Sequence, residues 1–193
     1  MRSLPEHPSF IALAAAHVEG RDFNRLVRPV EQSSVVVIAP HGGRIEPRTE
    51  SIAAQIAGTD FNLYCFISHL PAQSANLHIT SRNFDDPACL TLVASCTYVV
   101  AVHGWSGQRE ALLIGGLDTA LGGRLARSAR TIGIETLTKS AALSGTHPRN
   151  ICNRGASGRG VQLEFTTALR RSEKLPSLVS AIRSALLQCD GAS

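Results

Sequence analysis

Short runs of apolar, mostly β-branched residues alternate with segments of helical spacing along this 193-residue chain. Runs that are short and apolar throughout are typical of strands buried on both faces of a sheet. The clearest of them are residues 34–39, 98–102 and 111–114, and strands are also expected at 62–67 and 161–165. Weaker strands are expected at 22–28 and 132–136, and an edge strand at 75–81. The alternation with helices predicts an α/β fold with a mixed, mostly parallel sheet flanked by helices.

The segments between these runs carry helix signals. Ser9 is a possible cap for a helix over 9–17, Thr49 for a helix over 50–57, and Asp85 or Asp86 for a helix that begins at Pro87. Further helices are expected over 117–129 and 175–189, whereas 145–160 is a long loop of the kind that is often functional. Because no linker or repeat divides the chain and a second domain would be cramped, residues 1–193 are expected to form a single catalytic domain.

Charge and composition limit the kind of partner. The net charge is +4, and lysine occurs only as Lys139 and Lys174, so arginine carries almost all of the positive charge. Arginine binds carboxylates through a planar fork, and nucleic-acid binders usually cluster their cations, so a carboxylate-bearing substrate fits better than a nucleic acid. Five cysteines without a CxxC pair argue against a disulfide framework and against a cysteine zinc finger.

No targeting segment is evident in the sequence. The start, Met1 to His7, lacks the pattern of a secretion signal, and no apolar run is long enough to span a bilayer. We therefore expect a cytoplasmic protein without a membrane partner. The oligomeric state stays open, with a monomer as the default expectation.

Two of the apolar runs end in the same way, with a histidine followed by glycine. His41 follows the run 34–39, and His103 follows the run 98–102. In open α/β sheets, ligands bind beyond the carboxyl ends of the strands, so both imidazoles are expected at one site. Glu46 is the nearest carboxylate after His41, and two imidazoles with one carboxylate form a known catalytic zinc set. The pattern predicts one zinc ion per chain, held by His41, Glu46 and His103.

A metal site of this kind also needs a general base, and Glu164 is the candidate. It lies inside the strand expected at 161–165, where an ionised carboxylate needs either a partner or a task. The other interpretation is a charge on the solvent face of an edge strand. With zinc activating a water molecule, we expect hydrolysis of an amide bond, in which Glu164 takes the proton of the water and passes it to the leaving amine.

Several segments together resemble the phage-type poly-gamma-glutamate hydrolase family. They occur in the order of that family and comprise APHGGRIEPRT (39–49), LHITSRNFDDP (77–87), VAVHG (100–104), NICNRGASGRGVQLEFT (150–166) and the LRR that follows. The resemblance covers about Ser34 to Arg171. It implies a zinc-carboxypeptidase-like fold, with His41, Glu46 and His103 as zinc ligands and Glu164 as general base. It also implies poly-gamma-glutamate as substrate, a chain of glutamates joined through their side-chain carboxyls.

Substrate recognition by such an enzyme requires cations in the cleft, because each glutamate unit leaves a free α-carboxylate. The candidates in or beside the matched segments are Arg44, Arg82, Arg149 and Arg159 for substrate binding, Arg154 for substrate binding or oxyanion stabilisation, and His78 for bonding substrate or orienting a zinc ligand. Two features depart from the family's pattern. Four residues separate His41 from Glu46, where zinc carboxypeptidases have two, and Arg44 stands where the family often has a small residue.

Two other classes of protein stay open. Gly104-Trp105-Ser106 resembles the nucleophile turn of a serine esterase or amidase, but that motif needs glycine where this chain has Gln108. The glycine-rich segment 155–160 could cradle an anion in a non-catalytic polyanion-binding protein, although it lacks the lysine of a P-loop and precedes a strand. A chelator abolishes the activity of a zinc enzyme and leaves a serine enzyme unaffected.

Overall fold

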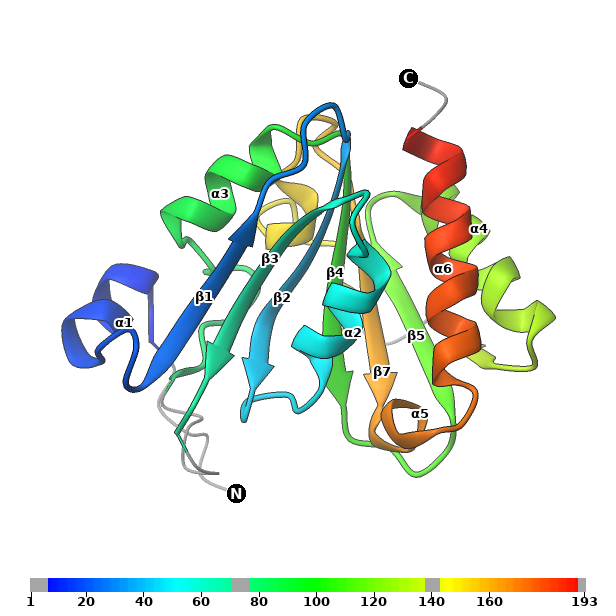
Figure 1. Ribbon diagram of the computed structural model, residues 1–193, viewed down its shortest axis with the longest axis horizontal. Helices are drawn as coiled ribbons and strands as arrows, with labels where there is room; N and C mark the ends of the chain where they lie inside the picture. Colours follow the sequence, from blue (N-terminus) through cyan, green and yellow to red (C-terminus); the bar gives the residue numbers. More distant parts are fainter. Residues whose placement is uncertain (1–6, 71–76, 138–142, 191–193) are drawn as a thin grey trace.

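One seven-stranded sheet runs through the protein between two layers of helices (Figure 1). The computed structural model describes residues 7–70, 77–137 and 143–190. The strand order is β1-β3-β2-β4-β7-β5-β6; the pairs β1–β3 and β5–β7 are antiparallel and the other neighbours are parallel. The predicted mixed, mostly parallel sheet is confirmed. Its strands are β1 (Phe23–Arg28), β2 (Val35–Gly43), β3 (Asn62–Ser68), β4 (Tyr98–Trp105), β5 (Ala111–Gly116), β6 (Glu135–Leu137) and β7 (Val161–Thr166).

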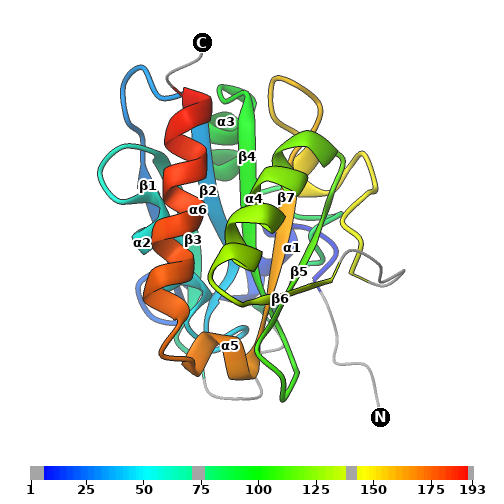
Figure 2. The same ribbon diagram turned by 90° about the vertical axis from the view of Figure 1, so that its right-hand side faces the viewer.

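The helices divide between the two faces of the sheet. One face is covered by α2 (Thr49–Ala57), α4 (Thr119–Thr131), α5 (Thr167–Arg171) and α6 (Leu175–Asp190), of which α4, α5 and α6 face the viewer in Figure 2. The other face packs against α1 (Phe10–Ala16), α3 (Pro87–Ala94) and the short 3-10 helix η2 (Ile151–Asn153). Within the described ranges, no helix has the length and apolarity needed to cross a membrane.

Two of the predicted helix caps are present and one is shifted. Ser9 caps α1 by accepting from the backbone N–H of Ala12, and Asp86 caps α3 by accepting from that of Ala88. The predicted cap at Thr49 is wrong by one residue, because Arg48 is the N-cap and Thr49 is the first helical residue. Arg48 has φ 77°, in the left-handed region that residues other than glycine rarely adopt.

The edge strand predicted at 75–81 is wrong for the residues that the structure describes. Residues 77–81 contain no strand, while 75 and 76 lie outside the described residues. Leu77 and Ile79 are apolar because both side chains are buried in the core on the α3 side of the sheet, and the residues that alternate with them are polar. The alternation therefore comes from an extended loop that covers a sheet face, and not from strand pairing.

An extra residue in β2 decides on which face of the sheet His41 lies. Between Ala39 and Gly42, three steps along β2 are matched by two steps along β3. Because side chains alternate along a strand, one extra residue reverses the face to which the following side chains point. Ala39 packs in the core under α2, whereas the ring of His41 contacts the carbonyl of Ile79 on the opposite face. This β-bulge brings His41 to the face where His103 also lies.

Candidate active site

The carboxyl ends of β2, β4 and β7 meet at a cavity of about 660 Å³. His41 and Glu46 reach it from β2 and the loop after that strand, His103 from β4 and Glu164 from β7. His78 reaches it from the segment between β3 and α3. Both histidines lie near the carboxyl ends of their strands. His103 is paired with Glu164 on β7, and His41 lies in the β-bulge between the paired residues Ala39 and Gly42.

The carboxylate of Glu46 lies between two imidazoles. Its Oε1 is 2.9 Å from Nδ1 of His41, and its Oε2 is 3.4 Å from Nδ1 of His103. The centroids of the two imidazole rings are 4.9 Å apart. Oε2 also accepts a hydrogen bond of 2.8 Å from the backbone N–H of Gly104. Side chains from two distant parts of the sequence, the His41–Glu46 segment and His103, therefore share one small volume.

The second nitrogen of each imidazole is held from outside this cluster. Nε2 of His41 is 2.8 Å from the carbonyl oxygen of Ile79, and Nε2 of His103 is 3.3 Å from Oγ of Ser81. A carbonyl oxygen only accepts, so neutral His41 carries its proton on Nε2 and directs the lone pair of Nδ1 toward Glu46. A metal-binding histidine has this arrangement, with one nitrogen free for the ion and the other fixed by a hydrogen bond.

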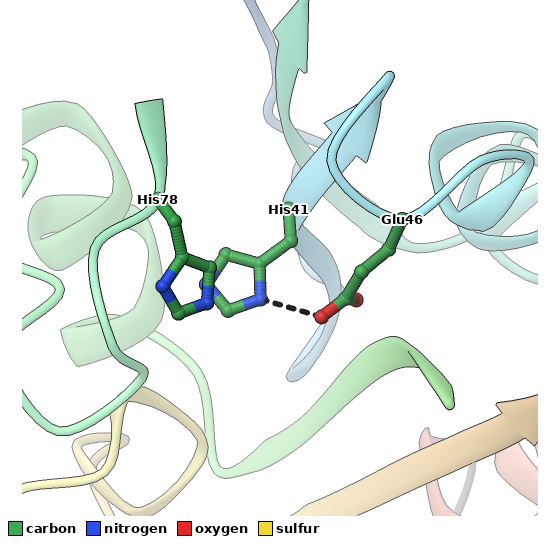
Figure 3. Close-up of side chains that lie close together, drawn as sticks. All are labelled: His41, Glu46 and His78. Atoms are coloured by element: carbon green, nitrogen blue, oxygen red, sulfur yellow. Dashed lines mark hydrogen bonds and ion pairs between the residues drawn. The ribbon is translucent and has the colours of Figure 1, made fainter. Parts of the chain in front are cut away.

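His78 belongs to the same cluster. Figure 3 shows its ring beside that of His41, and the two ring centroids are 4.3 Å apart. One nitrogen from each of these rings and one oxygen of Glu46 all lie within 4.8 Å of one another, so the three groups can hold one ion. From the sequence, His78 was predicted to bind substrate or to orient a zinc ligand; the structure makes it a candidate ligand as well.

The charge states in the cluster depend on one another. Burial raises the pKa of Glu46, but the neighbouring His41 and His103 outweigh it and hold that pKa far below its ordinary value. Burial lowers the pKa of His103, yet the charge of Glu46 raises it above the ordinary value. Burial and the nearby His41 lower the pKa of His78 to about 4, so its imidazole is neutral at pH 7, as metal binding requires.

Glu164 lies in the interior of the sheet. Its strand, β7, has β4 on one side and β5 on the other, and the residue is 4% exposed. The interpretation as a charge on the solvent face of an edge strand is therefore wrong. Its Oε1 accepts a hydrogen bond of 2.9 Å from Gln162, whose own Oε1 accepts from Asn150 at 2.8 Å. Burial raises the pKa of Glu164, although the nearby His103 opposes this.

The loop that carries Glu46 is closed by its own backbone. The N–H of Glu46 donates to the carbonyl of His41 at 2.8 Å, and Oγ1 of Thr49 donates to the carbonyl of Glu46, also at 2.8 Å. Nη1 of Arg170 donates to the carbonyl of Pro47 at 2.5 Å. The spacing of four residues between His41 and Glu46 thus forms a compact turn that returns the carboxylate to the imidazole.

Comparisons of sequence place the chain in a family. The sequence profile of the poly-gamma-glutamate hydrolases matches residues 7–174. The chain belongs to the poly-gamma-glutamate hydrolase family. It is 32% identical over 151 residues to the SPbeta prophage-derived UPF0714 protein YoqZ of Bacillus subtilis strain 168, across 77% of this chain and 54% of that protein. UPF0714 protein YndL of the same organism is 31% identical over 142 residues, across 72% and 56%. The chain spans about half the length of these two curated relatives.

Solved structures of family members share the fold. A bacteriophage poly-gamma-glutamate hydrolase superposes with a TM-score of 0.91 at 29% identity, over 97% of this chain and 99% of that one. YndL in a zinc-free form superposes with a TM-score of 0.84 at 23% identity, over 95% and 98%. The N-formylglutamate amidohydrolase from Ralstonia eutropha JMP134, at a TM-score of 0.53 and 10% identity over 89% and 97%, shares the fold alone. The predicted α/β fold, with its mixed sheet flanked by helices, is shared by the bacteriophage hydrolase and YndL.

The arginines that the resemblance suggested for substrate binding fall into two groups. Arg82 lines the active-site cavity and also a neighbouring groove, which Arg149 and Arg154 line with it. Arg44 and Arg159 are exposed and line neither of these two cavities. Nη1 of Arg154 donates to the carbonyl of Phe84 at 3.3 Å, outside the cavity that Glu164 lines, so the structure does not support the oxyanion role predicted for Arg154.

Ser106 lines the cavity, but its surroundings differ from those of a serine nucleophile. The segment after it leads into the strand β5, whereas a nucleophile elbow leads into a helix. Three other polar residues that contact the site or its supporting groups were not predicted from the sequence, namely Gln162, Asn150 and Arg170. Gln162 could have been found, because strand alternation places it on the same face as Glu164. Asn150 and Arg170 lie in segments that carry the family resemblance, 150–166 and the LRR that follows, but no role was predicted for either residue.

Proposed function

We propose that this chain is a zinc-dependent hydrolase of the γ-glutamyl amide bonds of poly-gamma-glutamate, acting as one catalytic domain. The observation that carries the proposal is the convergence of His41, Glu46 and His103 on one buried volume, with Glu164 opposite His103 on the adjacent strand. Membership of the poly-gamma-glutamate hydrolase family supports the substrate. The zinc-free form in which YndL was solved supports the metal.

The donor set fits a divalent cation. A half-buried carboxylate flanked by imidazole nitrogens offers the ligands that zinc prefers, and the opposite ring nitrogens are already held by Ile79 and Ser81. We assign His41, Glu46 and His103 to the ion because both rings contact Glu46. The ligand atoms of His41, Glu46 and His78 lie within 4.8 Å of one another, which makes His78 the alternative third donor. Zinc in such a site supplies Lewis acidity, which makes water acidic near neutral pH and polarises an amide carbonyl.

Glu164 is the general base in this proposal. It lines the cavity, and a raised carboxyl pKa suits a group that takes a proton from water and then gives it to the leaving amine. Gln162 fixes one of its carboxylate oxygens through a hydrogen bond. Arg82, at the rim shared with the neighbouring groove, is placed to bind an α-carboxylate of the substrate. Arg44 and Arg159 are not part of this proposed site.

The test is to incubate the purified, zinc-loaded protein with poly-gamma-glutamate and to follow chain length by size-exclusion chromatography. We expect the polymer to shorten, a chelator to stop the shortening, and added zinc to restore it. Poly-α-glutamate is the matched control, because it has the same charge per unit but a different amide linkage, and it should stay intact. Poly-gamma-glutamate that keeps its length with the zinc-loaded protein would contradict the proposal.

A serine hydrolase is a second candidate, and one specific contact favours it. Oγ of Ser81 lies 3.3 Å from Nε2 of His103, whose Nδ1 faces Glu46, in the serine–histidine–acid order of a catalytic triad. This arrangement replaces the Ser106 alternative. We favour the metal because Glu46 also faces Nδ1 of His41, a contact that a triad does not need. A serine-directed inhibitor should leave the activity unchanged, and inactivation by it would favour Ser81 as nucleophile.

A further inference from the structure

A second cavity, of about 380 Å³, adjoins the active-site cavity and is rich in arginine. Its lining includes Arg82, Arg149 and Arg154, with Asp85 as the single carboxylate among the residues that line it. We call it the arginine groove. Arg82 lines both cavities, and the chain passes from His147 in the first to Arg149 in the second. The two cavities are therefore adjacent parts of one surface.

The charges of the arginine groove are available to a ligand. All three arginines are exposed, and within the described part of the chain none of them forms an ion pair with a carboxylate. Arg154 uses one N–H on the carbonyl of Phe84 and keeps its other donors. Asp85 accepts from the backbone N–H of Phe10 at 2.5 Å. Three positive charges against one negative charge give this groove a potential that attracts anions.

Four other arginines of this protein have acidic partners. The pairs are Arg21 with Asp22, Arg25 with Glu19, Arg109 with Glu135 and Arg183 with Asp60. The arginine groove differs from them because like charges gather there without such partners. Desolvation, followed by the charges of Arg82 and Arg149, lowers the pKa of His147. The positive field therefore reaches the boundary between the groove and the active-site cavity.

We propose that the arginine groove binds α-carboxylates of glutamate units that lie away from the bond being cleaved, so that the cavity and the groove hold the same polymer. This inference rests on the proposed function. Each γ-linked unit presents one α-carboxylate, and a guanidinium fork matches a carboxylate through two parallel hydrogen bonds. A γ-glutamyl dipeptide occupies the cavity alone, so the groove contributes only to the binding of longer chains.

The experiment removes two charges from the groove and compares long with short substrates. The double variant Arg149→Gln with Arg154→Gln, which we call the groove pair, keeps Arg82, because Arg82 also lines the active-site cavity. The matched control is the double variant Arg109→Gln with Arg171→Gln, which we call the control pair. Both of these arginines are exposed and line neither the cavity nor the groove. We measure kcat/KM at low salt on long poly-gamma-glutamate and on a γ-glutamyl dipeptide. The dissociation constant of the polymer is measured with zinc-loaded Glu164→Gln protein that also carries either the groove pair or the control pair of substitutions.

The groove pair should lower kcat/KM on the polymer, and weaken polymer binding, by about tenfold, since each exposed ion pair contributes roughly two- to fivefold. The same pair should leave dipeptide cleavage unchanged, and added salt should reduce the difference on the polymer. The control pair should change each quantity by less than about twofold.

Three outcomes would overturn the inference: polymer cleavage and binding unaffected by the groove pair, an equal loss with the control pair, or an equal loss on the dipeptide. A failure of the proposed function has a different signature. In that case, the wild-type protein leaves the polymer intact, while polymer binding still depends on Arg149 and Arg154. If the wild-type protein cleaves the polymer and the groove-pair variant cleaves and binds it equally well, only the inference about the arginine groove is overturned.

Discussion

His103 on β4 lies directly opposite Glu164 on β7 in the register of the parallel pair. Neighbouring strands are about 4.8 Å apart, so side chains opposite each other on one face are in close proximity. The proposed zinc ligand and the proposed general base therefore both lie on paired strands in the interior of the sheet. Strand positions of this kind hold reacting groups more firmly than loops do.

Replacing Glu164 with Gln should abolish turnover while zinc stays bound. The amide has the shape of the carboxyl group but cannot take a proton, and general-base catalysis contributes about 10²–10⁴-fold to rate. Steady-state kinetics and the zinc content of the purified variant check this. Glu173→Gln, at an exposed glutamate, is the matched control and should behave as wild type. Loss of zinc from Glu164→Gln, or activity within about tenfold of wild type, would contradict the assignment.

His103→Ala and His78→Ala should separate the third zinc ligand from its neighbour. Nδ1 of His103 faces Glu46 while its Nε2 is held by Ser81, so removing this ring should eliminate zinc binding and activity. His78→Ala should keep stoichiometric zinc, with an affinity that falls by about 100-fold at most, as for a residue that supports a ligand. Atomic absorption and chelator competition measure both. The reverse result would make His78 the ligand in place of His103.

Ser81→Ala should lower activity by about 10–100-fold, the usual effect of losing a hydrogen-bond partner of a metal-binding histidine. Part of that loss should come from weaker zinc binding, so assays at saturating zinc should recover it. Removal of a serine nucleophile instead costs about 10⁶-fold in rate, whatever the zinc concentration. A complete loss that saturating zinc does not recover would therefore favour the serine mechanism. Ser106→Ala, assayed in parallel, tests the serine that the sequence first suggested.

Asp22 should make the folded state sensitive to acid. Its carboxylate accepts from the guanidinium of Arg21 and from the N–H of Val18, and these bonds lower the pKa of Asp22 below its ordinary 3.8. A carboxyl pKa that folding depresses stabilises the protein above the unfolded pKa, and this contribution is lost as pH falls toward the folded pKa. Below about pH 4, the free energy of unfolding should fall more steeply for wild type than for Asp22→Asn. Urea titrations over a pH series measure this, and parallel curves would rule it out.

Much of the fold could be predicted from the sequence because burial on both faces leaves a local signature. The runs at 34–39 and 98–102 are apolar throughout, since helices and loops cover each face of the sheet at these strands. The segment 77–81 was wrongly predicted as part of an edge strand, because alternation indicates only that every second side chain is buried. Leu77 and Ile79 are buried under a loop, and local sequence does not distinguish that from a strand.

The site was predictable where it depends on strand ends and not where it depends on tertiary contacts. His41 and His103 were predicted to lie together because the carboxyl ends of parallel strands meet at one edge of the sheet, and Glu46 was predicted as the nearest carboxylate after His41. The β-bulge that turns His41 to this face has no sequence signal that we could use. His78 enters the cluster from another segment, and its approach to His41 depends on how that segment packs over the sheet.

Arg170 is a residue whose position links the C-terminal part of the chain to the Glu46 loop. It is 8% exposed, and its Nη1 donates to the carbonyl of Pro47, next to Glu46. Its guanidinium packs so closely on Gly104 that a Cβ atom there would lie 2.9 Å from it. The N–H of Gly104 in turn donates to Oε2 of Glu46. Arg170 therefore supports the carboxylate through both the loop and the strand.

Arg170→Met should weaken zinc binding by about 10–100-fold while the protein still folds, because Glu46 would be held less firmly. Methionine can fill most of the space, and the buried Nε of Arg170, which has no hydrogen-bond partner within the described residues, would no longer need one. Arg170→Lys should not restore the affinity, since one ammonium cannot replace the bonds to both Pro47 and Thr167. Chelator competition measures the affinity, and thermal unfolding of the zinc-free protein measures folding. Arg171→Met, at the exposed neighbouring residue, is the control. An unchanged zinc affinity in Arg170→Met, or an equal loss in Arg171→Met, would show that Glu46 is positioned without Arg170.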